Sequence, residues 1–400
     1  MTRSPKLLAL LLILLPLHVV VGQKVDAAAL RSWIALDAPP GWEHLATDQI
    51  MKASPGWHRD ALGNLILRQG SGSPRRVVAC GLDRAGFAVT EITETGYLRL
   101  REVGSTRQHP LWTQFHEGQR IKVLTRARAV PGVVIVKSTH LQRGRQPNAP
   151  VTTLDDLWVD VGATSRSDVR ALGIEMLNPV VRDAVGWAYG DFVAGPSAGV
   201  RVGCAAVATA ASGRVERGET IFLLTTLRSF GNDGLEAALR SLGKVDQVTV
   251  IDQNPVTLPG FAAMNTITPR VRYAGSLVES VDVKDAESLL AAVKQKAGVS
   301  GQGSSRWVIL AESTTSKPNL TDGFAATASL LKSLADVPSV SGHERPVREA
   351  IVAALPPWAR SRTTTDKEGN LILEVGPDRD AHMFIAHQDE VGFEVATIGD

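Results

Sequence analysis

This chain contains the stretch Asp60-Ala-Leu-Gly-Asn-Leu-Ile-Leu-Arg-Gln-Gly70 and, much later, the closely matching stretch Asp366-Lys-Glu-Gly-Asn-Leu-Ile-Leu-Glu-Val-Gly376. A second pair follows at the same offset and without a gap: Val77-Val-Ala-Cys-Gly-Leu-Asp-Arg-Ala-Gly-Phe-Ala-Val89 and Met383-Phe-Ile-Ala-His-Gln-Asp-Glu-Val-Gly-Phe-Glu-Val395. The matched positions include glycine, asparagine, aspartate and phenylalanine as well as aliphatic residues, so chance is a poor explanation. Self-similarity of this length indicates two related domains rather than a short-period repeat protein.

The two copies differ at a position where a metal could bind. The later copy has His387 and Asp389 where the earlier copy has Gly81 and Asp83. Residues two apart on an extended strand face the same way, so the histidine and the aspartate could converge on one metal ion. Judged by spacing alone, His387 and Asp389 could instead be a structural or solvent-exposed pair that binds no metal. The later copy reaches only Asp400, and if the first copy shows the length of a full unit, most of the second is expected beyond this sequence.

Composition places the chain among ordinary globular proteins. It has 400 residues, of which 44% are hydrophobic and 21% are charged, which leaves room for two or three domains. Its 43 basic residues nearly balance its 41 acidic residues, and no Lys/Arg run stands out as a phosphate-binding stripe. We therefore expect no nucleic-acid partner.

The N-terminus has the pattern of a cleaved secretory signal over residues 1–22. A short positive segment precedes the apolar run Leu7–Val21, and small residues lie before Gln23. This predicts a secreted or periplasmic protein with no stable membrane span after cleavage; an uncleaved anchor is the alternative. Export permits disulfides, but only Cys80 and Cys204 are present. The favoured interpretation is two buried free thiols, and a single bridge stays open.

The pattern of apolar runs changes along the chain. Several short strands with glycine and proline punctuation, within residues 89–159, predict a small β-barrel or sandwich inserted into a host domain. From Trp158 onward, strands alternate with helices, including a helix predicted over residues 203–211, which is typical of βα units feeding a mostly parallel sheet. Residues 298–322 are rich in Gly, Ser and Thr around the strand-like run Trp307–Leu310, and we interpret them as a linker.

Three motifs in the later copy resemble a known family. They are Pro338-Ser-Val-Ser-Gly-His-Glu344, Asp366-Lys-Glu-Gly-Asn-Leu-Ile372 and Ala386-His-Gln-Asp-Glu-Val-Gly-Phe393. Together, and in this order, they closely resemble the opening of the glutamyl aminopeptidase and tetrahedral aminopeptidase family. The resemblance implies a zinc-exopeptidase α/β fold, a three-layer α/β/α domain with an inserted small β-barrel. It also implies two divalent metal ions, zinc or cobalt, that activate a water to cleave N-terminal peptide bonds, a peptide substrate, and a possible homo-oligomer.

The resemblance also implies roles for single residues. In the later copy it makes His387 a metal ligand and Asp389 the residue that orients it. In the earlier copy Gly81 stands where the family has its histidine, and Gly199 stands in place of the bridging aspartate. Arg228 and Ser229 replace the general base and a ligand, which leaves Asp83 and Asp252 as vestiges, each more simply explained by a structural role. Neither glycine nor a guanidinium can bind a cation, so Arg84 and Arg228 would make this place electropositive.

These inferences predict a degenerate exopeptidase-like domain over residues 23–88 and 160–297, the β-barrel over 89–159, the linker, and the start of a second copy over 323–400. The function expected is that of an exported metal-dependent aminopeptidase-like protein with an inactive first copy. The alternative is a non-catalytic pseudopeptidase that acts as a peptide-binding or assembly module. In either case the 400-residue chain alone is expected to show little or no peptidase activity.

Overall fold

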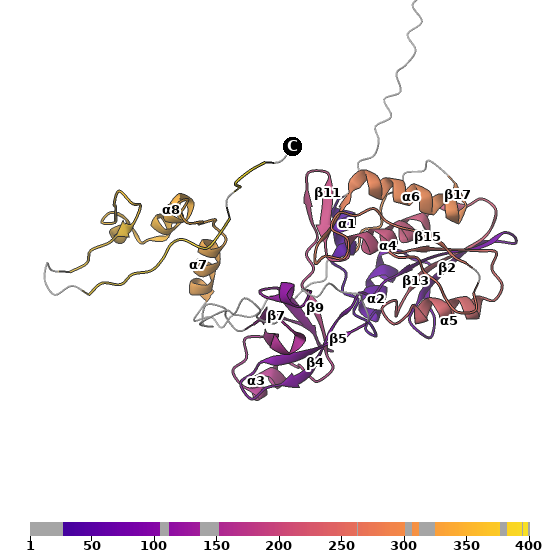
Figure 1. Ribbon diagram of the computed structural model, residues 1–400, viewed down its shortest axis with the longest axis horizontal. Coiled ribbons are helices and arrows are strands. Elements are labelled where there is room, and N and C mark those ends of the chain that lie inside the picture. The colour runs from indigo at the N-terminus through magenta and orange to yellow at the C-terminus, as the bar shows by residue number, and fades with distance from the viewer. Residues whose placement is uncertain are drawn as a thin grey trace, which may run out of the picture. The chain divides into compact units, whose positions relative to one another are not determined.

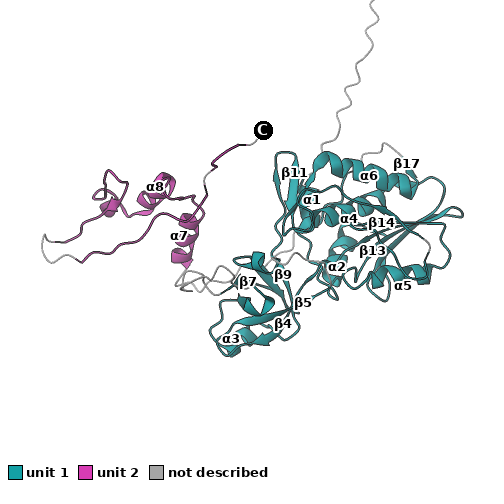
Figure 2. Ribbon diagram, in the orientation of Figure 1, with its two compact units in different colours: residues 1–316 teal, residues 317–400 magenta. Residues whose placement is uncertain are grey.

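The computed structural model describes residues 27–104, 112–136, 152–261, 263–300, 306–311, 325–376, 382–393 and 395–398. The predicted signal peptide lies outside the described residues. The chain forms two compact units, residues 1–316 and residues 317–400, which Figure 2 distinguishes by colour. Within the described ranges, no helix is both long and apolar enough to cross a membrane.

The first unit is built around a six-stranded sheet (Figure 1). In spatial order its strands are β1 (His58–Arg59), β2 (Leu65–Ser71), β13 (Gly218–Thr225), β3 (Arg75–Gly81), β14 (Gln247–Ile251) and β15 (Asn265–Ile267). The last four run parallel, β2 is antiparallel to β13, and β1 is antiparallel to β2. Because parallel strands end at the same edge of a sheet, the chain segments that follow Gly81, Thr225 and Ile251 converge there.

Helices cover both faces of this sheet. Side chains alternate between the two faces along each strand, and apolar side chains lie on both faces, so each face needs a layer of helices to bury it. One face packs against α1 (Ala27–Ile34), α2 (His44–Ala53), α4 (Ala198–Ala210) and α6 (Val283–Ala297), and the other packs against α5 (Asp233–Leu242). On β3, for example, Val78 faces the first group of helices and Val77 faces α5. The predicted three-layer α/β/α arrangement is confirmed.

A closed six-stranded barrel is inserted between β3 and α4. Its strands, in spatial order, are β4 (Gly86–Ile92), β5 (Leu98–Val103), β8 (Trp158–Asp160), β7 (Ala129–Ile135), β6 (Arg120–Leu124) and β9 (Pro179–Arg182). Their inward side chains form a separate hydrophobic core. The predicted small barrel is therefore present, but it continues to Arg182, because β8 and β9 close it instead of leading back into the sheet.

Smaller elements complete the first unit. A three-stranded sheet consists of β10 (Trp187–Tyr189), β11 (Phe192–Gly195) and β16 (Glu279–Asp282), and β12 (Arg214–Val215) pairs with β17 (Val299–Ser300). The helix α3 (Arg166–Ala171) follows β8 in the chain, and short 3-10 turns lie at Gln114–His116 and Leu154–Asp156.

The run Trp307–Leu310 is part of the main core rather than a free linker. Trp307 and Leu310 are buried with the α1 and α4 side chains. The indole Nε1 of Trp33 donates to the carbonyl of Val308 at 2.8 Å, and the Val308 amide donates to Thr209 Oγ1 at 3.2 Å. The Gly/Ser/Thr-rich composition of residues 298–322 predicted a connector, but the buried apolar side chains of Trp307 and Leu310 tie this run to the core of the first unit.

The second unit contains α7 (Ala325–Ala335), α8 (Arg345–Ala354), α9 (Pro357–Arg360), β18 (Thr364–Thr365) and β19 (Leu371–Ile372). Its hairpin repeats the β1–β2 hairpin of the first unit. In both, an aspartate accepts the amide of an asparagine four residues on, at 3.0 Å for Asp60 and 2.8 Å for Asp366, and the glycine just before that asparagine has a φ of +88°. The repeated Asp-x-x-Gly-Asn words therefore fold into the same turn, in which the positive φ requires glycine.

Candidate functional site

A cleft of about 710 Å³ lies in the first unit where the parallel strands end. The residues that line it come from the loops after β3, β13 and β14, from the start of α4, and from the barrel. The carboxyl edge of a parallel sheet is where open α/β folds bind their ligands. The predicted vestigial positions Arg228, Ser229 and Asp252 lie in the wall of this cleft.

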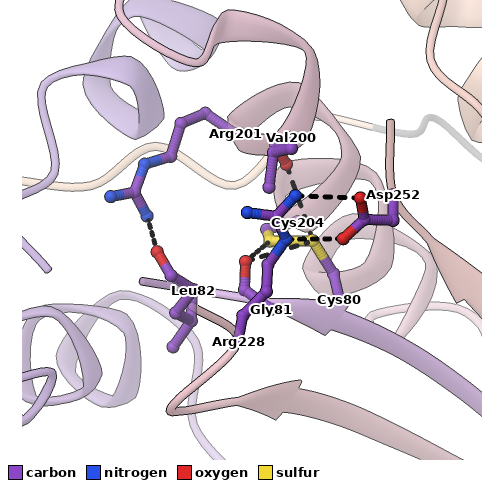
Figure 3. Close-up of a disulfide and its surroundings, with 8 residues drawn as sticks. All are labelled: Cys80, Gly81, Leu82, Val200, Arg201, Cys204, Arg228 and Asp252. Atoms are coloured by element: carbon purple, nitrogen blue, oxygen red, sulfur yellow. Dashed lines mark hydrogen bonds and ion pairs between the residues drawn. A yellow bond between two sulfur atoms is a disulfide. The ribbon is translucent and has the colours of Figure 1, made fainter. Parts of the chain in front are cut away.

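The side chain of Arg228 fills the space beside Gly81. A β-carbon added at Gly81 would lie 2.5 Å from Cδ, 2.6 Å from Cβ and 2.8 Å from Cγ of Arg228, distances that no real contact tolerates. Figure 3 shows the two residues side by side, with the guanidinium directed at Asp252. Any residue larger than glycine at position 81 would therefore clash with the Arg228 side chain.

Arg228 and Asp252 form a bidentate ion pair. Arg228 Nε donates to Asp252 Oδ2 at 2.5 Å and Nη2 donates to Oδ1 at 2.8 Å. The side chain of Arg228 is 19% exposed and that of Asp252 is 5% exposed, so water screens the pair weakly. Burial alone would lower the pKa of Arg228, but the hydrogen bonds and charge of Asp252 outweigh it and raise that pKa. Arg228 is therefore a permanent cation in the cleft.

Two buried carboxylates hold the loop that carries Arg228. Asp83 accepts the amides of Arg228 at 2.5 Å and of Ser229 at 2.8 Å, and Glu43 accepts the amide of Leu227 at 2.9 Å. Burial raises the pKa of Glu43, and the nearby charge of Asp83 adds to the effect. The hydrogen-bonding role expected for Asp83 is confirmed, and both oxygens of this carboxylate are directed at the loop rather than into the cleft.

Gly199 is also enclosed by neighbouring side chains. A β-carbon there would lie 2.0 Å from Gln253 Nε2 and 2.5 Å from Val271 Cγ1, while its amide donates to Glu279 Oε2 at 3.1 Å. The helix α4 begins at Ala198, before the predicted start at Gly203. The predicted start was wrong, because the helix runs through both Gly199 and Gly203, which permit close packing of α4; at Gly203 a β-carbon would lie 2.5 Å from Ile251 Cγ2.

Cys80 and Cys204 form a disulfide that joins the end of β3 to α4 (Figure 3). Both residues are fully buried and their Cα atoms are 5.2 Å apart. The favoured interpretation of two free thiols was wrong. The pairing depends on β3 and α4 meeting across a sequence separation of 124 residues, which spacing in the sequence does not reveal.

The predicted metal-binding pair of the second unit is present but isolated. His387 Nδ1 lies 3.3 Å from Asp389 Oδ1, and the His387 side chain is 91% exposed. Asp389 Oδ2 accepts the hydroxyl of Ser341 at 2.7 Å, and this bond, followed by the contact with His387, lowers the pKa of Asp389. Across all the ranges that the structure describes, no three His, Cys, Asp or Glu side chains cluster so as to hold a metal ion.

The barrel contributes cleft residues to which the sequence analysis assigned no functional role, namely Trp112, His116 and Arg182. The His116 ring makes edge contacts with Phe87 at 5.1 Å and Trp112 at 5.5 Å between ring centroids. The Arg182 guanidinium lies 5.9 Å from the centre of the Trp112 ring. Trp112 and His116 are only four residues apart, but Phe87 and Arg182 reach them from distant strands of the closed barrel, so a local sequence pattern does not bring the four together.

His116 is expected to make the first unit sensitive to acid. Burial, and next the charge of Arg182, lower the pKa of His116 from 6.5 to about 4. Since this pKa is lower in the folded state than in the unfolded state, the stabilisation is complete above pH 6.5 and is lost as the pH falls through about 4. Protonation of His116 between pH 6.5 and 4 should therefore lower the free energy of unfolding by roughly 3 kcal/mol.

Denaturant unfolding at several pH values tests this expectation. Carboxylates titrate in the same window, so the decisive quantity is the difference between the wild type and His116→Phe, which keeps a ring against Phe87 and Trp112. The stability of the variant should fall less between pH 6.5 and 4. Identical pH profiles for the two proteins would show that His116 does not control the acid response.

The described geometry can be compared with known proteins. The sequence model of the family described as M42 glutamyl aminopeptidase matches residues 63–258. The putative aminopeptidase FrvX of Escherichia coli K12 is 32% identical over 151 residues, covering 37% of this chain and 41% of that protein. The lysyl aminopeptidase of Pyrococcus furiosus is 29% identical over 157 residues, covering 38% and 44% respectively. The chain spans about half the length of the curated relatives it matches.

Solved structures share the fold of the first unit. A TET aminopeptidase from a Thaumarchaeota archaeon superposes with a TM-score of 0.58 at 17% identity, covering 68% of this chain and 97% of that one. The TET1 peptidase of Pyrococcus horikoshii gives a TM-score of 0.57 at 21% identity, covering 67% and 98%. At these identities the likeness establishes the fold.

Proposed function

Residues 63–258 belong to the M42 glutamyl aminopeptidase family, and from this premise we propose that the chain is an aminopeptidase-like protein whose first unit is a non-catalytic copy. The observation that carries the proposal is the position of Arg228. Its side chain fills the space beside Gly81, where the family resemblance expects a metal-binding histidine, and its charge is neutralised by Asp252.

The residues of the first unit do not fit a two-metal centre. Divalent metals in such sites are held by imidazole and carboxylate donors. Here Gly81 and Gly199 offer no donor atom, Arg228 adds a fixed positive charge, and Asp83 is turned to the backbone. A cation placed next to the Arg228 guanidinium would meet repulsion in a weakly screened site.

We place the peptidase chemistry in the second copy. Support comes from the sequence repeat, from the identical Asp-x-x-Gly-Asn turns, and from the pairing of His387 with Asp389. Metal ions bound in a complete site of this kind would polarise a peptide carbonyl and activate a water. Of the described residues in the second unit, His387 would serve as a ligand and Asp389 would fix the orientation of its ring.

Export and self-association are part of the proposal. The signal-like residues 1–22 and the buried Cys80–Cys204 bridge support an oxidising compartment, secreted or periplasmic. Homo-oligomer formation is proposed by analogy, since the Pyrococcus horikoshii TET1 peptidase assembles into a tetrahedron or a large octahedral shell.

Hydrolysis and metal binding by the 400-residue chain test the proposal. The wild type should release no amino acid from a panel of aminoacyl p-nitroanilides with zinc or cobalt added, and the first unit should not retain metal after dialysis. His387→Ala is the matched control. A chelator-sensitive rate that survives His387→Ala would place catalysis in the first unit and overturn the proposal. A rate that His387→Ala abolishes would contradict the inactivity expected of this chain while leaving the first unit non-catalytic.

A further inference from the structure

We propose that the cleft of the first unit is a binding site for a small carboxylate, such as the α-carboxylate of an amino acid or a short peptide, held by Arg84 and Arg182. The inference goes beyond the proposed function, because it concerns what the cleft binds rather than whether it catalyses. It depends on cationic groups of the cleft that lack a carboxylate partner.

Arg84 is the first of these groups. It follows Asp83 after β3 and lines the cleft. Its Nη1 atom reaches the carbonyls of Ile34 and Pro196 only at 3.5 Å each, and its Nη2 atom is buried with no hydrogen-bond partner among the described residues. A buried guanidinium nitrogen without a partner is costly, and a bound anion would supply the missing acceptor.

Arg182 is the second group. At the end of β9 it lies in the wall of the same cleft, donating from Nη1 to the Leu277 carbonyl at 2.8 Å. Within the described ranges neither Arg182 nor Arg84 forms an ion pair. Burial, and next repulsion from Arg84, lower the pKa of Arg182 to about 9. The two cations therefore destabilise each other, and an anion between them would relieve that repulsion.

Two carboxylates that line the cleft, Asp252 and Glu279, already have other hydrogen-bond partners. Asp252 is committed to Arg228, and Glu279 accepts the amides of Gly199 and Gly275, both at 3.1 Å. Glu102 is exposed on a barrel strand. Asp37, whose charge acts on Arg84, accepts Lys122 Nζ at 2.6 Å through Oδ2, while its Oδ1 is buried without a hydrogen-bond partner among the described residues. Asp252, Glu279 and Asp37 therefore form no ion pair with Arg84 or Arg182 in the described part of the chain.

The shape and lining of the cleft favour an organic carboxylate. Guanidinium groups bind planar carboxylates through paired, parallel hydrogen bonds. Phe87, Trp112, Val181 and Val200 give the same cleft an apolar wall, which suits the hydrocarbon part of an amino acid or dipeptide. The volume of about 710 Å³ is within the range of small-molecule sites. Inorganic phosphate would satisfy the cations but not this wall.

Calorimetric titration of the full chain with Ala-Leu, Ala-Leu amide and inorganic phosphate tests the proposal. Ala-Leu should bind at least about tenfold more tightly than its amide, which lacks the charged carboxylate. It should also bind more tightly than phosphate. Equal binding of the peptide and its amide, the absence of peptide binding at millimolar concentration, or tighter binding of phosphate would each overturn the proposal.

Variants locate the site. Arg182→Met should weaken Ala-Leu binding about tenfold or more, and Arg214→Met, an exposed arginine of β12 away from the cleft, is the matched control that should bind like the wild type. Because Arg84 is more enclosed, Arg84→Met should be tested by thermal unfolding with and without Ala-Leu. The ligand should raise the Tm of the wild type and not that of the variant. An unchanged affinity in Arg182→Met would overturn the assignment whether or not Arg84→Met folds.

Discussion

Replacing Cys80 and Cys204 together by alanine is expected to lower the free energy of unfolding of the first unit by roughly 4 to 5 kcal/mol. The bridge closes a loop of 124 residues, and the entropy removed from the unfolded chain grows with the length of that loop. The bridge joins β3 to α4 next to Gly81 and Arg228, so its loss should also loosen the carboxyl edge of the sheet.

Urea unfolding monitored by tryptophan fluorescence measures this loss, because all tryptophans except Trp358 belong to the first unit. The control is the wild type in a reducing agent, which should approach the midpoint of the variant, while the agent should leave the variant unchanged. A midpoint that is the same with and without the bridge would contradict the expectation.

The layers of the fold could be predicted because they depend on local periodicity. Apolar runs such as Val77–Ala79 and Ile221–Leu224 are buried on both faces, as strands covered by helices on both sides require. The barrel was predicted for the same reason. Its extent was not, because β8 and β9 are only three and four residues long and are distinguished from sheet strands by their neighbours alone.

The composition of the site was partly visible in the sequence. A motif comparison could show that Gly81, Gly199 and Arg228 do not provide the expected donors. It could not show that Arg228 reaches into the space beside Gly81 and binds Asp252, because Gly81 ends β3 while Arg228 and Asp252 follow β13 and β14, which are neighbours of β3 only in the folded sheet. The same is true of the disulfide and of Arg182, which depend on tertiary contacts rather than on spacing.

The contact between Gly81 and Arg228 explains why a strand glycine and a buried arginine are found together. A glycine at the end of β3 costs backbone entropy, and a buried arginine costs desolvation. Each makes the other possible, because Gly81 provides the space for the Arg228 side chain and Asp252 provides the compensating charge. The Arg228 side chain thus fills the space beside Gly81, where the family resemblance expects a metal-binding side chain.

Removing only the negative partner should therefore be strongly destabilising. Asp252→Ala is expected to lower the free energy of unfolding by roughly 3 kcal/mol or more, because it leaves Arg228 charged and mostly buried without its acceptor. Removing both charges together, in Arg228→Met with Asp252→Leu, should cost clearly less, since no uncompensated charge then stays in the cleft.

A double-mutant cycle on Arg228 and Asp252, measured by urea unfolding, gives the coupling energy directly. The matched control is the exposed pair Glu236 and Arg240 on α5, whose coupling should be below about 1 kcal/mol because water screens it. If the Asp252→Ala loss were as small as that of Glu236→Ala, Arg228 would not be an obligatory part of this site. A large coupling would instead establish that this ion pair stabilises the first unit, in agreement with the proposal that Arg228 is a fixed part of a site that holds no metal.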